Sequence, residues 1–125
     1  MPEVLILRHK EHTLTIYEKY KMAKCEINAG ICGFSTTVEA TDSVKWKIRL
    51  KITSDCPNIQ KLAEELIEIN ALDEIAKRAK STKTYEIAAK HIPHCSCIVP
   101  SGIIKAVEVA AGLALPKNAS ITIEK

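Results

Sequence analysis

Five cysteines are the most unusual feature of this 125-residue chain. They fall in three separate segments: Cys25 with Cys32, then Cys56, then Cys95 with Cys97. Thiolates act as nucleophiles, redox groups and ligands for iron and zinc, so these residues are the first candidates for chemistry. An odd number of cysteines argues against a simple disulfide framework. The cysteines therefore direct the search for function toward free thiols or a metal centre.

The sequence around the cysteines predicts that each lies at the boundary of a secondary-structure element. Cys32 is flanked by Gly30 and Gly33, which allow the backbone to come close to a bound group. Cys56 and Cys97 both shortly precede a proline that opens a predicted helix. Helix amino-termini carry partial positive charge and free N–H groups, which lower the pKa of a thiol and stabilise anions. If these boundaries meet at one end of the domain, several thiolates converge there.

Four thiolates are the usual ligand set of an iron–sulfur cluster, and they also suit structural zinc. The spacings leave the choice open, because Cys-x6-Cys and Cys-x-Cys match neither the zinc-ribbon knuckle nor the ferredoxin run. Of the last two cysteines, Cys97 lies closer to the helix start, so Cys95 is the spare candidate. A metal-free redox or sulfur-transfer thiol at Cys32 or Cys56 is an alternative, and so is independent burial of the cysteines as small apolar residues.

Composition and charge narrow the class of protein. Apolar residues make up 46% of the chain and charged residues 26%, which is typical of a globular domain. A net charge of +3 is too small to indicate nucleic-acid binding. The longest apolar-rich stretch, residues 98–115, is interrupted by a proline and two charges, and the amino-terminus does not read as a signal peptide. We therefore expect a cytoplasmic protein with no membrane or nucleic-acid partner.

The first half of the chain predicts strands. Residues 4–7 and 12–20 suit a hairpin that turns at Lys10 and Glu11, and it forms an extension in residues 1–20. Residues 24–28 and 35–40 suit further strands, with a turn at residues 41–43. Residues 44–52 alternate between an apolar and a basic face, which indicates an antiparallel sheet with one wet side. The apolar face holds Trp46, Ile48, Leu50 and Ile52, and the basic face holds Lys45, Lys47, Arg49 and Lys51.

The second half predicts helices and a final strand. Apolar residues at helical spacing run from Ile59 to Ile69, and shorter helical segments follow at residues 72–79 and 84–91. A helix from Pro100 to Ala111 is expected to stop at Gly112. Residues 119–124 suit a closing strand with Ile121 and Ile123 directed inward. The whole chain, residues 1–125, is thus predicted to be one α+β domain, a two-layer sandwich of a mostly antiparallel sheet with helices on one face.

The segment from Cys25 to Leu115 resembles a family of small cysteine-motif proteins from anaerobic archaea and bacteria. The matching motifs are Cys25 with Ala29-Gly30-Ile31-Cys32-Gly33-Phe34, Ser54-Asp55-Cys56-Pro57, and Cys97-Ile98-Val99-Pro100 leading into residues 104–116. The resemblance implies that Cys25, Cys32, Cys56 and Cys97 belong to one motif set. It supports a cluster or metal role, and it leaves Cys95 outside the clearest pattern.

These observations lead to one hypothesis of function. The sequence predicts a small cytoplasmic protein that binds an iron–sulfur cluster, [4Fe-4S], through Cys25, Cys32, Cys56 and Cys97, with Cys95 as a further candidate. Its expected role is electron transfer or the handling of clusters or sulfur, with a redox or sulfur-transfer protein as partner. The alternatives are a zinc-stabilised interaction module and a metal-free thiol protein. Isoleucine-rich helices and an open sheet edge are compatible with a homodimer.

Overall fold

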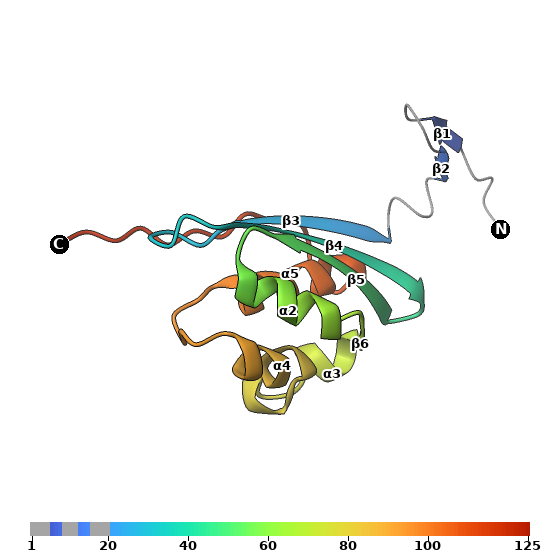
Figure 1. The fold of residues 1–125 in the computed structure, drawn as a ribbon. Helices are drawn as coiled ribbons and strands as arrows, with labels where there is room; N and C mark the ends of the chain where they lie inside the picture. The colour runs from blue at the N-terminus through green and yellow to red at the C-terminus, as the bar shows by residue number, and fades with distance from the viewer. Residues whose placement is uncertain (1–5, 9–12, 16–20) are drawn as a thin grey trace.

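The computed structural model describes residues 6–8, 13–15 and 21–125. Its main body is a four-stranded antiparallel sheet with helices on one face (Figure 1), which confirms the predicted α+β fold. In sheet order, the strands are β3 (Met22–Asn28), β4 (Ser35–Val44), β5 (Lys47–Ser54) and β6 (Glu68–Asn70). The helices are α2 (Pro57–Glu65), α3 (Ala71–Ile75), α4 (Lys83–His91) and α5 (Val99–Ala110), with a 3-10 turn, η1 (Ala79–Ser81), before α4.

A separate hairpin precedes this body. Strands β1 (Ile6–Arg8) and β2 (Thr13–Thr15) pair antiparallel, with Leu7 opposite Leu14, and form a two-stranded sheet of their own. The hairpin predicted for the first twenty residues is confirmed to this extent. The turn predicted at residues 10–11 lies outside the described residues.

Strand β5 carries the alternation that the sequence predicts. Ile48 and Leu50 are buried under the helices, whereas Lys47, Arg49 and Lys51 are exposed on the other side of the sheet. Helix α2 packs on β5, and α5 packs on β3 and β4. The core between the two layers is aliphatic. The largest fully buried side chains in it are those of Ile48, Ile59, Leu62, Leu66 and Ile103.

The turn between β4 and β5 lies later than the sequence predicts. Residues 41–43 do not form a turn, because β4 continues through Val44 with Asp42 opposite Ile48. A register shift between Asp42 and Val44 absorbs the extra length. The chain instead reverses at Lys45 and Trp46, where Trp46 adopts a positive φ of 66° and packs partly buried against the core. Trp46 therefore belongs to the turn and not to the strand predicted for residues 44–52.

The predicted helix from Ile59 to Ile69 is shorter in the structure. Helix α2 ends at Glu65, and Ile69 lies on β6 opposite Ile48. The backbone N–H of Leu50 donates to the Ile67 carbonyl at 2.7 Å, so the chain leaves the helix to pair with β5. Ile69 fits the apolar spacing of a helix, and it fits equally well on the helix-facing side of β6 at the edge of the sheet. Similarly, the segment predicted as a helix at residues 72–79 divides into α3 and η1.

The prediction for the carboxyl-terminal residues is correct for the end of the last helix and wrong for the closing strand. Helix α5 ends at Ala110 and Gly112 follows with a φ of 75°, as expected for a glycine stop. The closing strand predicted at residues 119–124 is wrong for the single chain, because these residues form no strand. Ile121 and Ile123 are 70% and 87% exposed. Figure 1 shows the reason: the segment after α5 runs past the β3–β4 turn and leaves the domain.

Candidate functional site

The strand register brings distant cysteine-bearing segments to one end of the domain. The end of β3 meets the start of β4, with Asn28 opposite Ser35, and the start of β4 meets the end of β5, with Thr36 opposite Ser54. Helix α2 begins directly after this edge, and the α4–α5 connection lies at the same end (Figure 1). We call this end the cysteine pole and define it by residues 25–35, 54–57 and 94–102. The convergence of segments that the sequence predicts is therefore present.

Ser54 connects two of these segments. Its hydroxyl lies 2.8 Å from Thr36 Oγ1 and donates to the Ser35 carbonyl at 3.2 Å. The same oxygen accepts the backbone N–H of Cys56 at 3.0 Å. Because Cys56 is the N-cap of α2, this serine fixes the helix start against the first residues of β4. The sequence analysis gave Ser54 no such role, since its partner on β4 lies eighteen residues away.

Cys25 lies on the helix-facing side of the sheet, close to α5. It is the fourth residue of β3, so the prediction that each cysteine lies at an element boundary is wrong for Cys25. A Cβ atom placed on Gly102 would lie 3.6 Å from Cys25 Sγ and only 2.3 Å from Ile27 Cδ1. Gly102 is therefore the residue that lets the first turn of α5 approach β3. The sequence suggests that a glycine beside a cysteine allows the backbone to approach closely. At Cys25, this close approach depends on Gly102, which lies on another element, helix α5.

The environment of Cys25 favours the protonated form of its thiol. Burial raises the pKa of the Cys25 thiol above its usual value, and the carboxylate of Glu26 adds to the increase. The ammonium of Lys105 opposes both effects. A thiol with a raised pKa is a poor nucleophile at neutral pH. Such a thiol must also lose its proton before it can bind a metal ion.

The cysteines divide into two groups by exposure. Cys25, Cys56 and Cys97 are half-buried and pack against the same hydrophobic core. Cys32 and Cys95 are exposed. None of the five forms a disulfide. Three of the four predicted ligands are therefore half-buried against the core, whereas the fourth predicted ligand and the spare cysteine are exposed.

Cys32 lies in the turn between β3 and β4. Gly30 and Gly33 both have positive φ, 92° and 77°, and the Gly33 N–H donates to the Gly30 carbonyl at 2.9 Å. The Gly30 N–H donates to Asn28 Oδ1 at 3.1 Å. The two glycines are thus required by the turn itself, and a side chain at either position would be strained. Their place beside Cys32 confirms the predicted glycine turn.

The thiols do not form a preassembled metal site. Within residues 21–125, no three His, Cys, Asp or Glu side chains lie close enough together to hold one metal ion. The fold thus brings the predicted ligands to one end of the domain without bringing three of them to one point. A metal centre at the cysteine pole would therefore require the cysteine-bearing segments to move toward one another.

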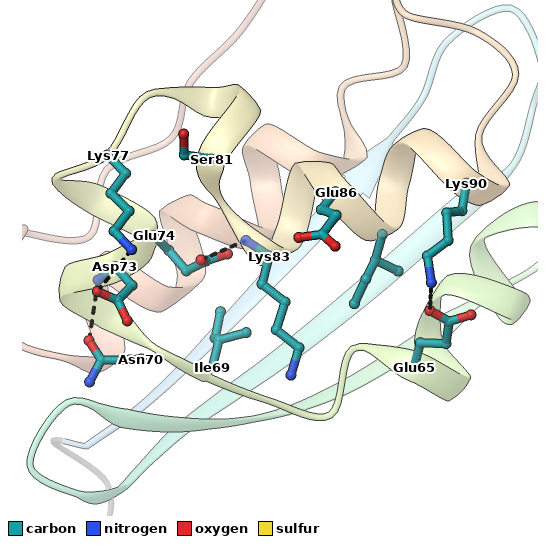
Figure 2. A pocket seen from close by; sticks show the side chains of 11 residues that line it. Glu65, Ile69, Asn70, Asp73, Glu74, Lys77, Ser81, Lys83, Glu86 and Lys90 are labelled. Carbon is teal, nitrogen blue, oxygen red and sulfur yellow. Dashed lines mark hydrogen bonds and ion pairs between the residues drawn. The ribbon is translucent and has the colours of Figure 1, made fainter.

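A second region stands out by shape. A charged cleft of about 630 Å³ lies beside β6, α3 and α4, and side chains from these elements and from the end of α2 line it (Figure 2). Lys90 Nζ lies 2.9 Å from Glu65 Oε2, and Lys77 Nζ lies 3.5 Å from Asp73 Oδ1. Hydrogen bonds from Lys90 and His91 lower the pKa of Glu65. None of the described residues that line the charged cleft is a cysteine.

Glu74 supports the wall of this cleft. Its side chain is buried, and its carboxylate accepts the backbone N–H groups of Lys83 and Thr84 at 3.0 and 2.7 Å together with the Thr84 hydroxyl. Thr82 completes the cap, because its hydroxyl accepts the Tyr85 N–H at 3.1 Å. Glu74 thus satisfies free N–H groups at the start of α4, which is a structural task. No short-range sequence signal reveals it, because the two partners lie nine and ten residues away.

Comparison with known proteins places the chain in a family without a described role. Residues 23–123 match the model of a family of unknown function, DUF6951, and the chain belongs to this family. No curated protein and no solved structure matches the chain. None of the described helices is long and apolar enough to cross a membrane. The functional argument therefore depends on the cysteine pole itself.

Proposed function

We propose that the protein holds an iron–sulfur cluster at the cysteine pole through the thiolates of Cys25, Cys32, Cys56 and Cys97. The observation that supports this proposal is that the segments bearing the cysteines meet at one end of the domain, where Cys25, Cys56 and Cys97 are half-buried. Four cysteine thiolates are the usual ligands of a [4Fe-4S] cluster, and apolar surroundings limit solvent access to such a centre. In the cytoplasm, where thiols stay reduced, a cluster would equip the protein for electron transfer or for passing a cluster or sulfur to a partner protein.

The proposal assigns a distinct task to each group of cysteines. Cys25, Cys56 and Cys97 form the base of the site, and Cys32 supplies the fourth thiolate from the exposed glycine turn. Because no three thiols lie within reach of one metal among residues 21–125, Cys25, Cys56 and Cys97 have to draw together and the Cys32 turn has to close toward them when the cluster is bound. The raised pKa of Cys25 makes uptake pH-dependent, because a ligand thiol must first lose its proton. Uptake is therefore expected to improve as the pH rises.

Anaerobic preparation of the protein tests the proposal. We expect a brown protein with roughly four iron and four acid-labile sulfide per chain after reconstitution. Replacing any one of Cys25, Cys32, Cys56 or Cys97 by serine should lower the iron content strongly. Cys95→Ser is the matched control, because Cys95 is also a cysteine of the pole and is exposed like Cys32. Far-UV circular dichroism of each variant shows whether the fold is kept.

Two other results would replace this function by a different one. A colourless protein with one tightly bound zinc would indicate a zinc-stabilised interaction module. A colourless, metal-free protein in which Cys32 or Cys56 is alkylated rapidly would indicate a redox or sulfur-transfer thiol protein. Loss of iron in Cys95→Ser but not in Cys97→Ser would keep the cluster and correct the ligand set.

A further inference from the structure

The segment after α5 has the pattern of a β-strand but no strand partner within the described chain. Ile121 and Ile123 alternate with polar residues, and both are highly exposed. Figure 1 shows this segment extended beyond the β3–β4 turn and away from the sheet. Exposing two isoleucines on the same side of an extended segment is unfavourable, at about 25 cal/mol per Å² of apolar surface. We call residues 119–124 the tail strand.

The main sheet offers an edge of matching length and pattern. Strand β3 is the outer strand of the sheet, and no described strand pairs with its free side. Its residues alternate: Ala23, Cys25 and Ile27 face the helices, whereas Lys24 and Glu26 are exposed. The strand contains no proline, and its seven residues pair in one continuous register with β4. An open, regular edge of this kind readily accepts another strand.

We propose that the protein forms a symmetric dimer in which the tail strand of each copy adds to the β3 edge of the other copy. Addition of an extended segment to a sheet edge supplies backbone hydrogen bonds, and alternate side chains fix the register. A two-fold axis beyond the cysteine pole makes the two additions equivalent. The tail strand leaves the domain at the end where β3 finishes, so under this symmetry it runs antiparallel to the partner copy's β3.

One antiparallel register satisfies both the apolar and the charged residues. Placing Ile123 opposite Cys25 puts Ile121 opposite Ile27, so both isoleucines join the helix-facing side of the sheet. The same register puts Glu124 opposite Lys24 on the exposed face. Lys24 already lies 3.4 Å from Glu26 along its own strand, and Glu124 adds a second carboxylate across the interface.

The family match supports a shared role for both surfaces. The matched stretch runs from residue 23 to residue 123, so it contains β3 from its second residue and the tail strand through its last isoleucine. The hairpin formed by β1 and β2 lies outside it. Apart from Glu124, the residues paired in this register therefore lie within the matched family stretch.

Measurement of the molar mass in solution tests the dimer. For the reduced, metal-free full chain, light scattering coupled to size exclusion should give twice the 13.8 kDa chain mass. The double variant Ile121→Asp/Ile123→Asp should weaken dimerisation at least about 100-fold, because it places two charges at an apolar interface. Leu115→Asp is the matched control, since Leu115 is 89% exposed but lies outside the tail strand. A monomeric wild-type protein, or a double variant that remains dimeric, overturns the proposal.

A cysteine cross-link tests the register and the exchange between copies. In a Cys32→Ser/Cys95→Ser background, Ile123→Cys should form a disulfide with Cys25 under mild oxidation and give a covalent dimer. Directly opposite Cβ atoms of antiparallel strands lie about 4.5–5.5 Å apart, close to the reach of a disulfide. Thr122→Cys is the control, because it faces the other side of the sheet. A cross-link within one chain, or equal cross-linking of both variants, contradicts the proposed exchange. These experiments use metal-free protein, so their outcome is independent of cluster binding.

Discussion

The cysteine pole and the charged cleft differ in whether their reactive side chains are already bonded to other groups of the protein. In the charged cleft, Lys90 pairs with Glu65 and Lys77 with Asp73, and the Glu74 carboxylate is occupied by the start of α4. At the cysteine pole, no thiol is consumed in a disulfide, although three thiols are held against the core. Several polar groups of the charged cleft are therefore already paired within the protein. The charged cleft is distinguished by its concave shape, and the cysteine pole is distinguished by cysteines that form no disulfide.

The largest effect that this comparison predicts lies in the charged cleft. Glu74→Ala removes the acceptor for two backbone N–H groups and one hydroxyl at the start of α4. Because those donors are in a buried or half-buried region, the loss should cost about 2–4 kcal/mol of unfolding free energy. Urea denaturation followed by circular dichroism measures this change. If Glu74 were a binding residue held ready for a ligand, its removal would leave stability almost unchanged.

The neighbouring residue provides the control for this experiment. Asp73 is also acidic and also lines the charged cleft, but its ion pair with Lys77 is exposed and 3.5 Å long. Asp73→Ala should therefore cost less than about 1 kcal/mol. Equal losses in the two variants would contradict the capping role given to Glu74.

A smaller effect is expected at the cysteine pole from Gly102→Ala. The new Cβ would lie 2.3 Å from Ile27 Cδ1, so either Ile27 changes rotamer or α5 moves away from β3. Overpacking of this kind costs about 1–3 kcal/mol, and the better helix propensity of alanine returns about 1 kcal/mol. We expect a net loss of about 1 kcal/mol, measured by urea denaturation. Adding Ile27→Val, which removes Cδ1, should restore part of the loss.

The matched control for this variant is the preceding position. Ser101→Ala changes an exposed residue of the same helical turn. The variant also removes an exposed hydrogen bond of 3.0 Å to the Tyr85 hydroxyl, so its stability should stay within about 1 kcal/mol of the wild-type value. A gain in stability for Gly102→Ala itself would show that the approach of α5 to β3 does not depend on the missing side chain.

Local patterns in the sequence predicted the elements of this fold and missed the places where long-range pairing decides. The alternation of β5 and the stop at Gly112 follow from neighbouring residues, and both are confirmed. Ile69 satisfies helical spacing and strand pairing equally, and only the presence of β5 decides between them. The polar residues 41–43 resemble a turn, yet the pairing of Asp42 with Ile48 keeps them in a strand.

The candidate site was predictable to a similar degree. The sequence identified the cysteines and the glycine turn at residues 30–33, because both are local features. It could not identify Gly102 or Ser54 as the residues that position Cys25 and Cys56, since their partners come from other elements. Nor could it predict which thiols are half-buried, because burial depends on how α5 and α2 pack on the sheet.

The smallest predicted effect concerns the exposed ion pairs at the rim of the charged cleft. Hydrogen bonds from Lys90 and His91 lower the pKa of Glu65, so the ionised carboxylate is favoured in the folded state. A lowered carboxyl pKa stabilises the fold above the usual pKa of glutamate, and this contribution is lost as the pH falls through the folded value. The wild-type protein should therefore melt slightly above Glu65→Gln at pH 6, and the difference should shrink as the pH falls through the folded pKa of Glu65. Glu64→Gln, at an exposed neighbour on α2, is the matched control. Because the pair is solvent-exposed, added salt should reduce the margin at pH 6, and a margin that grows on acidification would mean that the carboxylate of Glu65 destabilises the folded chain.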